Sequence, residues 1–216
     1  MKKKIVALAL VFCLSLAIGV GGTLAYLTAT TQTVTNTFTV GNVSFDTAAL
    51  DEADVDVYGV KETVSDGEGG TKDAPRVTAN KYKLIPGHTY VKDPTIHIGA
   101  GSENAWLFVK VENGISAIEA TGDTTIASQM AAKGWAAVPT DSNIYYWPTQ
   151  VTANQDVVVF ESFKLATDAA VANYANASIT IQAGIVQAEG FATASAAWTA
   201  AGDQLFTTSD PADPAE

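Results

Sequence analysis

The sequence predicts an all-β protein, built as an antiparallel two-sheet sandwich with short inserted helices. About nine short segments rich in Val, Ile, Thr and aromatic residues are separated by clusters of Gly, Pro, Asn and Asp, which is typical of sandwiches and not of parallel α/β units. Residues 33–40 alternate strictly, with Thr at odd positions and mainly apolar residues at even ones. Residues 106–113 (WLFVKVEN) are the strongest strand-forming run of the chain.

The elements follow from periodicity and from turn residues. Strands are expected at 33–40 with its continuation at 43–45, and at 55–60, 77–85, 91–98, 106–113, 135–138, 144–147, 157–165 and 178–187. Short helices are expected at 124–133 (N-cap Thr124, with Gly134 past its end), 169–174 and 193–201. A flexible Gly-rich loop is expected at 66–70. Pro86-Gly87 predicts a type II turn, because Pro fixes φ at one central position and Gly supplies a positive φ at the next.

The domain boundaries follow from the same reading. The sandwich is expected at 41–191, a short C-terminal helix at 192–208, and a disordered acidic tail at 209–216. The preceding segment, 26–40, is expected to be a separate N-terminal strand. A chain of this length is long enough to bury one substantial core.

Composition indicates export and excludes two classes of partner. The chain has 216 residues, 12 basic and 23 acidic side chains, and three lysines but no acid lie before residue 25. If the first 25 residues are removed as a signal peptide, the mature chain has 191 residues with 9 basic and 23 acidic side chains, a net charge of −14. Such a charge repels nucleic acid and anionic lipid surfaces. Cys13 is the only cysteine, so the mature chain forms no disulfide and no thiolate metal site.

The first 25 residues are predicted to be a signal peptide. Three lysines precede an apolar run to Val20, and Thr23 and Ala25 supply the small residues that a signal peptidase requires. This places cleavage between Ala25 and Tyr26, after which no membrane span is expected. The alternative is an uncleaved anchor, because residues 5–27 are uncharged and long enough to cross a bilayer.

Three stretches carry a family resemblance. They are the junction 21–26 (GGTLAY) with 36–43 (NTFTVGNV), the stretch 84–98 (LIPGHTYVKDPTIHI) before the aromatic strand, and the ending 187–191 (QAEGF). Together they resemble the TasA/camelysin family of secreted biofilm-matrix and cell-surface proteins. The signal peptides of that family are processed by SipW-type signal peptidases, so such a peptidase is the expected processing partner.

The resemblance implies a jelly-roll-like sandwich and fibres joined by donor-strand complementation. The segment 26–40 suits a donor strand because it has high β-propensity and no charge, Pro or Gly, and such segments add readily to an open sheet edge. Val34, Phe38 and Val40 would be the inserted residues. Partners would be further copies of the chain and other matrix proteins. The alternative is that this strand pairs within its own sandwich.

The sequence contains no recognisable catalytic motif. Camelysin-like relatives have been classed as metallopeptidases, but His-Glu-x-x-His is missing, and His88 and His97 with Asp93 are better interpreted as surface groups than as zinc ligands. Gly-x-Ser-x-Gly is also missing, and without a mature cysteine no Cys–His pair can form. We therefore expect no enzymatic activity and no cofactor.

Two binding features have simpler interpretations. Asp51, Asp54 and Asp56 resemble the start of a calcium loop, yet the expected Gly and bidentate Glu are out of place, so a solvated acidic loop is preferred. Aromatic residues at strand spacing could form a glycan- or partner-binding face, but at such spacing they more often belong to the core. These residues are Trp106, Trp135, Tyr145, Tyr146, Trp147 and Trp198.

Three functional hypotheses result. The first is a secreted structural protein of the extracellular matrix or cell surface that assembles into fibres by donating its mature N-terminal strand. The second is a surface binding module for a glycan or protein. The third is a camelysin-like metallopeptidase, which the missing zinc motif disfavours.

Overall fold

The computed structural model describes residues 42–206. By its internal contacts the chain divides into two units, Met1–Val40 and Gly41–Glu216, and the described residues belong to the second. The predicted signal peptide, the cleavage site Ala25–Tyr26, the candidate donor strand with Val34, Phe38 and Val40, and the predicted tail at 209–216 lie outside the described residues.

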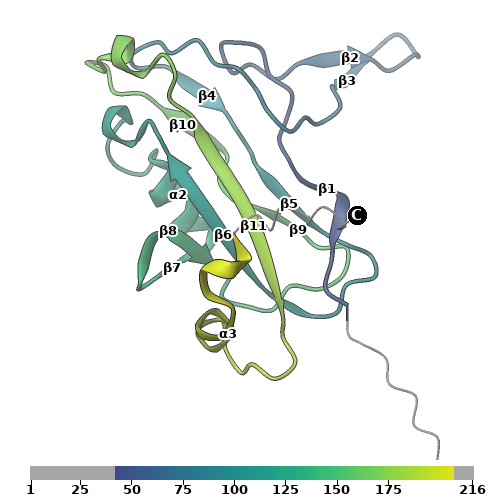
Figure 1. Ribbon diagram of the computed structural model, residues 1–216. Coiled ribbons are helices and arrows are strands. Elements are labelled where there is room, and N and C mark those ends of the chain that lie inside the picture. Colours follow the sequence, from purple (N-terminus) through teal and green to yellow (C-terminus); the bar gives the residue numbers. More distant parts are fainter. Residues whose placement is uncertain (1–41, 207–216) are drawn as a thin grey trace, which may run out of the picture. The chain divides into compact units, whose positions relative to one another are not determined.

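The described residues form two layers of antiparallel sheet, which confirms the all-β, sandwich-like prediction (Figure 1). One layer has the order β1 (Phe45–Asp51), β5 (Thr95–Ile98), β9 (Asp156–Val158), and is continued by β4 (Thr89–Val91) paired with β10 (Ser162–Lys164). The other has the order β11 (Ile179–Gln187), β6 (Ala105–Asn113), β8 (Asp141–Tyr146), β7 (Ala136–Val138). The jelly-roll connectivity implied by the resemblance stays a prediction.

Short elements complete the unit. A small hairpin of β2 (Thr63–Ser65) and β3 (Thr71–Asp73) stands away from the two layers in Figure 1. The helices are η1 (Ser116–Ile118), α2 (Ile126–Lys133), η2 (Val171–Tyr174), α3 (Ala194–Ala201) and η3 (Gly202–Leu205). Within residues 42–206, none of these helices is both long and apolar enough to cross a membrane.

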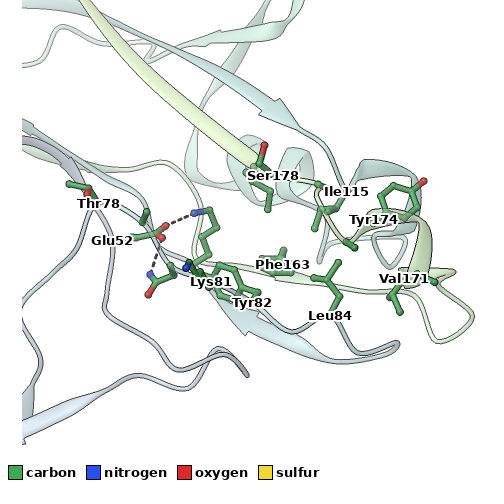
Figure 2. A pocket seen from close by; sticks show the side chains of 17 residues that line it. Glu52, Thr78, Lys81, Tyr82, Leu84, Ile115, Phe163, Val171, Tyr174 and Ser178 are labelled. Carbon is green, nitrogen blue, oxygen red and sulfur yellow. Dashed lines mark hydrogen bonds and ion pairs between the residues drawn. The ribbon is translucent and has the colours of Figure 1, made fainter.

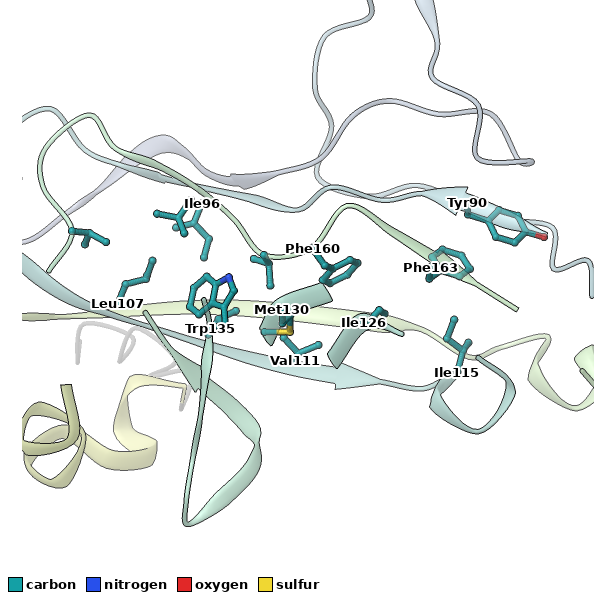
Figure 3. Close-up of a cluster of buried hydrophobic side chains, with 14 of the residues drawn as sticks. Tyr90, Ile96, Leu107, Val111, Ile115, Ile126, Met130, Trp135, Phe160 and Phe163 are labelled. Carbon is teal, nitrogen blue, oxygen red and sulfur yellow. The ribbon is translucent and has the colours of Figure 1, made fainter. Parts of the chain in front are cut away.

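The core lies between the layers, and β6 is its centre (Figure 3). Side chains of a strand alternate between its faces, so Leu107, Val109 and Val111 point inward, where they are buried with Ile96 of β5. Farther along, the Phe163 ring stacks on Tyr90 at 4.7 Å between centroids. The inner face of β6 therefore holds the two layers together.

A second, smaller cluster covers the outer face of β6. Trp106 and Phe108 are buried there against α3. The Trp198 ring of α3 lies 5.4 Å from that of Phe108. Trp106 and Trp135 donate their indole N–H groups to backbone carbonyls. The aromatic residues thus belong to the packing, as predicted: Trp106 and Trp135 are buried, and Tyr145, Tyr146, Trp147 and Trp198 are half-buried.

Two predicted strands are wrong. Residues 55–60 form a turn, because the Asp56 carboxylate accepts hydrogen bonds from the N–H groups of Tyr58 (2.8 Å) and Val60 (2.9 Å) and so competes with strand pairing. Residues 77–85 are irregular apart from a bridge between Val77 and Glu52. The loop predicted at 66–70 is confirmed as the turn of the β2–β3 hairpin, whose strands were not predicted.

The long predicted strands at 91–98 and 157–165 are each interrupted. Pro94 cannot donate to a ladder, and its carbonyl accepts the N–H of Val159 at 2.8 Å where the two strand pairs meet. The predicted type II turn is confirmed, with Gly87 at φ 76° and the His88 N–H bonded to the Ile85 carbonyl at 3.1 Å.

The two α-helices are capped close to where the sequence predicts. α2 begins one residue later than expected: Thr125, and not Thr124, is its N-cap and accepts the Ser128 N–H at 3.1 Å. Gly134 ends α2 with φ 102°, as predicted. Thr193 caps α3 and accepts the Ala196 N–H at 3.2 Å.

Substitution of Gly59 tests how closely the turn at residues 55–60 packs against β4. Its φ is 75°, and a Cβ at this position would lie 2.7 Å from the Cα of Tyr90. We expect Gly59→Ala to lower the free energy of unfolding by about 2–4 kcal/mol, because both the backbone strain and the clash must be relieved. Chemical denaturation followed by tryptophan fluorescence measures this.

The matched control is Gly67→Ala. Gly67 also has a positive φ of 84°, but a Cβ there would meet no atom within 4 Å. This variant should lose only about 1–2 kcal/mol, the cost of the left-handed conformation alone. Equal losses in the two variants would contradict the close packing of the turn on β4.

Candidate functional site

A groove opens along one side of the sandwich, between the edge strands of its two layers. Its larger hollow, of about 720 Å³, lies between the irregular segment 78–84 and the start of β11. A smaller hollow of about 160 Å³ adjoins it between the end of β1 and residues 179–181 of β11. Several residues line both hollows, so the two are neighbouring parts of one groove.

Burial decreases from the centre of each layer toward this groove. In the β11 layer, Leu107 and Val109 of β6 are fully buried. The inward row of the neighbouring β11 is only half-buried and comprises Ile179, Ile181, Ala183 and Ile185. In the other layer Ile96 of β5 is fully buried, whereas Leu50 of β1 is half-buried. The core is therefore incompletely covered on this side.

The edges of both layers are open beside the groove. β11 pairs with β6 over nine residues from Ile179 to Gln187, and β1 pairs with β5. Within residues 42–206, no other strand pairs with either of them on the remaining edge. An open edge of this length presents backbone N–H and C=O groups that can pair with a further extended segment.

One end of the groove is apolar. Leu84, Ile115, Phe163, Val171 and Tyr174 line the larger hollow there. Figure 2 shows Leu84, Val171 and Tyr174 at this end and Glu52 at the opposite end. Such a surface favours apolar side chains, because burial removes their carbon atoms from water.

The middle of the groove carries a buried polar cluster. Glu52 and Lys92 form an ion pair in which they are 3% and 9% exposed. The Asn80 amide donates to Glu52 Oε1 at 2.9 Å and to the Ala53 carbonyl at 2.8 Å. We call Glu52, Asn80 and Lys92 the polar station. Because Glu52 and Lys92 line both hollows, these two charges lie where the hollows adjoin.

A buried ion pair is costly unless hydrogen bonds satisfy the charges. Asn80 supplies one such bond, and its own Oδ1 is held by the Val55 N–H at 3.1 Å. Burial, aided by the carboxylates of Glu52 and Asp93, raises the pKa of Tyr82. Tyr82 is therefore neutral at the groove wall, where its hydroxyl donates to the Val91 carbonyl at 3.1 Å.

A second charged cluster holds the end of β1 against β5. Arg76 pairs with Asp51 and Asp93 and donates to Thr95 Oγ1 at 2.8 Å. His97 Nε2 lies 3.0 Å from Asp51 Oδ1. Burial opposes the charge of Asp51, yet the hydrogen bonds from Arg76 and His97 lower the pKa of its carboxyl. This cluster fixes the strand that forms one wall of the groove.

His97 is the titrating member of this cluster. Its Nδ1 lies 2.7 Å from Asp156 Oδ1, and its Nε2 faces Asp51. Burial disfavours the imidazolium, but hydrogen bonds to the two carboxylates outweigh that and raise the pKa of His97.

The structure does not assemble the metal sites weighed from the sequence. Of the three calcium candidates, Asp51 is bound to Arg76 and His97, and Asp56 accepts backbone N–H groups in its turn. The other zinc candidate, His88, contacts the Tyr58 carbonyl at 2.8 Å, away from the carboxylates that hold His97. Within residues 42–206, no group of three His, Cys, Asp or Glu side chains could hold a metal ion.

Sequence reasoning missed the polar station. Glu52 stood within an acidic stretch, and Lys92 and Asn80 have no motif around them. The residues become neighbours only because the irregular segment 78–84 lies against β4 and the end of β1. Only Tyr82 and Leu84 were placed together on one face by their alternation, and both do pack against the core.

The described site is a groove with a larger hollow that is apolar at one end, a smaller and mainly polar hollow beside Asp51 and Thr180, and open strand edges beside both. These features fit an extended peptide better than a compact small molecule, because the edges offer a ladder of backbone bonds. Comparison of the chain with protein-family models, with curated proteins and with solved structures finds no match. Function is therefore inferred from the chemistry of the groove.

The charged cluster at β1 predicts a pH dependence of stability. Because the pKa of His97 is raised in the folded chain, protonated His97 stabilises the fold at pH values below the unfolded pKa of about 6.5, and this contribution is lost as the pH rises through the folded pKa. Wild type should exceed His97→Gln in free energy of unfolding by roughly 0.5–1 kcal/mol at pH 5.5, and the difference should vanish near pH 9.

Urea denaturation of both chains across this pH range measures the difference. Asp51 stays ionised throughout, since its pKa is lowered. Asp156→Asn removes one of the two carboxylates that face His97, and should reduce the pH-dependent part without abolishing it. A difference between wild type and His97→Gln that is constant with pH would contradict the assignment.

Proposed function

We propose that this chain is a secreted, non-enzymatic structural protein of the extracellular matrix or cell surface. Its subunits join into fibres when the mature N-terminal strand, residues 26–40, enters the open groove of the next subunit. The observation that carries the proposal is the half-buried inner row of β11 beside an open strand edge.

A strand in the groove would pair the open edge of β11 and cover the apolar side chains that the described unit leaves partly exposed. It would pair with the outer edge of β11 and cover the inward row from Ile179 to Ile185. Burying the part of one such isoleucine that is still exposed contributes roughly 0.5 kcal/mol. The three isoleucines of the row therefore favour insertion by about 1–2 kcal/mol before the ordering of the strand is counted.

The sequence of residues 33–40 suits this position. Eight residues in extended form span about 26 Å, close to the length of the nine-residue β11. The even positions Val34, Phe38 and Val40 supply apolar side chains for the groove. The odd positions are all Thr, whose branched side chains favour an extended backbone and tolerate water on the other face.

Exchange of this strand between subunits produces a chain of subunits. The donor segment and the groove are different surfaces, so the contact is head-to-tail, and such contacts give open filaments when they do not close into a ring. The donor precedes β1 directly along the chain. Insertion into its own groove is the competing outcome and would give a monomer.

The proposal predicts that donor and groove can be inactivated separately. A chain lacking residues 26–40 should stay monomeric, because it can accept a strand but cannot donate one. Ile181→Lys places a charge on the inner row of β11 and should also prevent filaments, because the groove then rejects an apolar strand. Electron microscopy and size-exclusion chromatography of the mature chain measure both effects.

The matched control is Gln182→Lys, which adds the same charge to the neighbouring, exposed position of β11. This variant should form filaments as the wild type does. A mixture of the donor-deleted chain and Ile181→Lys should form one-to-one dimers and no filaments, because one supplies the groove and the other the strand. A wild-type chain that stays monomeric at every concentration, or filaments from either defective chain alone, would refute the proposal.

A further inference from the structure

We infer that the polar station is the site of a self-catalysed covalent cross-link, an amide bond between the side chains of Lys92 and Asn80, with Glu52 as the proton-transfer group. The reaction involves only residues of the described unit and does not depend on fibre assembly. It modifies the chain itself once and has no turnover, so it is compatible with a structural role.

Glu52 holds the two reacting groups beside each other. Its Oε2 pairs with Lys92 Nζ, and its Oε1 accepts an N–H of Asn80 Nδ2 at 2.9 Å. Figure 2 shows these two bonds as the dashed lines at Glu52. The nucleophile and the leaving group are therefore bonded to the two oxygens of one carboxylate, which is the place from which a single group can take a proton from one and give it to the other.

The backbone positions these three side chains independently of one another. Glu52 and Val77 exchange both of their backbone N–H···O bonds at 2.8 Å, which holds Glu52 beside the segment that carries Asn80. Lys92 follows β4 directly, and its N–H donates to the Glu161 carbonyl at 3.1 Å. Folding thus brings the amine and the amide together before they react, so that the reaction is intramolecular between oriented groups.

Burial makes the amine of Lys92 available for attack. Glu52 and Lys92 are 3% and 9% exposed, and the centroid of the Tyr82 ring lies 6.0 Å from Lys92 Nζ. Two charges are costly in such surroundings, and transfer of one proton from Nζ to Glu52 Oε2 converts them into a neutral amine and a neutral carboxylic acid. The neutral amine has the lone pair that a nucleophile requires.

The amide of Asn80 is oriented as the electrophile. Its Oδ1 accepts the Val55 N–H at 3.1 Å, and its Nδ2 also donates to the Ala53 carbonyl at 2.8 Å. Negative charge develops on Oδ1 when Cγ becomes tetrahedral, and the Val55 N–H already points at this oxygen, as an oxyanion donor must. The two bonds also distinguish the oxygen of the amide from its nitrogen, which identifies Nδ2 as the leaving group.

The reaction forms the Nζ–Cγ bond and breaks the Cγ–Nδ2 bond. Two of the three protons on Lys92 Nζ pass through Glu52 to Nδ2, which leaves as ammonium through the larger hollow that Asn80 lines. Glu52 ends as a carboxylate, and nothing is oxidised or reduced. The product is a secondary amide, and the chain loses one molecule of ammonia, about 17 Da.

The cross-link supports a wall of the groove that neither sheet holds. The segment 77–85 is irregular apart from the bridge at Val77, and the new bond ties it to the residue that follows β4. The mature chain has no cysteine, so a disulfide cannot supply this tie. A covalent bond of either kind restricts the unfolded chain, and an amide does so irrespective of redox conditions.

Intact-mass measurement of the purified, folded chain tests the inference. The wild-type chain should weigh about 17 Da less than its sequence. Trypsin should release residues 77–81 joined to residues 84–110, because a modified Lys92 is no longer cleaved. A folded wild-type chain at its full sequence mass would overturn the inference.

Three variants assign the roles. Lys92→Arg keeps a positive charge beside Glu52 but supplies no nucleophilic amine, so it should keep its full sequence mass. Glu52→Gln keeps the shape of the side chain and removes the proton transfer, and should slow the loss of ammonia at least about 100-fold. The matched control is Lys81→Arg, an exposed lysine that lines the same hollow, and this variant should lose ammonia as the wild type does.

A second reaction would give the same change in mass and must be separated from the first. Asn113 precedes Gly114, and such a pair loses ammonia when its side chain closes onto the following backbone nitrogen. The tryptic peptides distinguish the two, and Lys92→Arg does not alter Asn113. A mass loss that maps to Asn113, or one that persists in Lys92→Arg, would contradict the cross-link and leave the proposed function standing.

Discussion

Burial of β6 on both faces is the constraint from which the rest of the described structure follows. Its inward side chains join the layers, its outward Trp106 and Phe108 lie under α3, and both of its edges are paired, with β11 and with β8. β6 is therefore the strand with the most contacts inside the subunit: it pairs with β11 along its whole length and with β8 at residues 108–110. β11 lies one position farther out: its inner row is half-buried against the core, and its outer face is covered only toward its end, where Gly184 approaches Leu205. The incomplete coverage of the core is therefore found at the two edge strands that border the groove, β11 and β1.

The opposite wall of the groove is held by polar contacts more than by packing. β1 pairs with β5 with an irregularity between Phe45 and Leu50, and its apolar side chains are only half-buried. Its far end is fixed by the Arg76 and His97 contacts to Asp51. Before its start, the Asn42 carbonyl accepts the Glu103 N–H at 2.9 Å. Directional bonds at both ends keep this wall in place without an apolar partner across the groove, and so they keep the groove open.

The sequence predicted the fold class and the continuous elements but not the groove. The strands at 105–113 and 179–187 were predictable because they are long and apolar on their inner faces. The errors at 55–60 and 77–85 have local causes, namely the Asp56 side chain that closes a turn and a segment whose backbone pairs with neighbouring loops. The polar station joins residues 40 positions apart, Glu52 and Lys92, and no periodicity signals such a contact. What the sequence did mark was the alternation of 33–40, which lies outside the described residues and whose role stays a prediction.

An open groove lined only by apolar side chains would accept many β-forming segments, including wrong ones. The Glu52–Lys92 pair lines this groove as an ion pair that is already buried and that Asn80 also bonds, so the groove is not uniformly apolar. The formal charge of −11 on the whole chain further opposes indiscriminate contact between subunits. In the proposed assembly, affinity would come from the open edge of β11 and from its half-buried inward row.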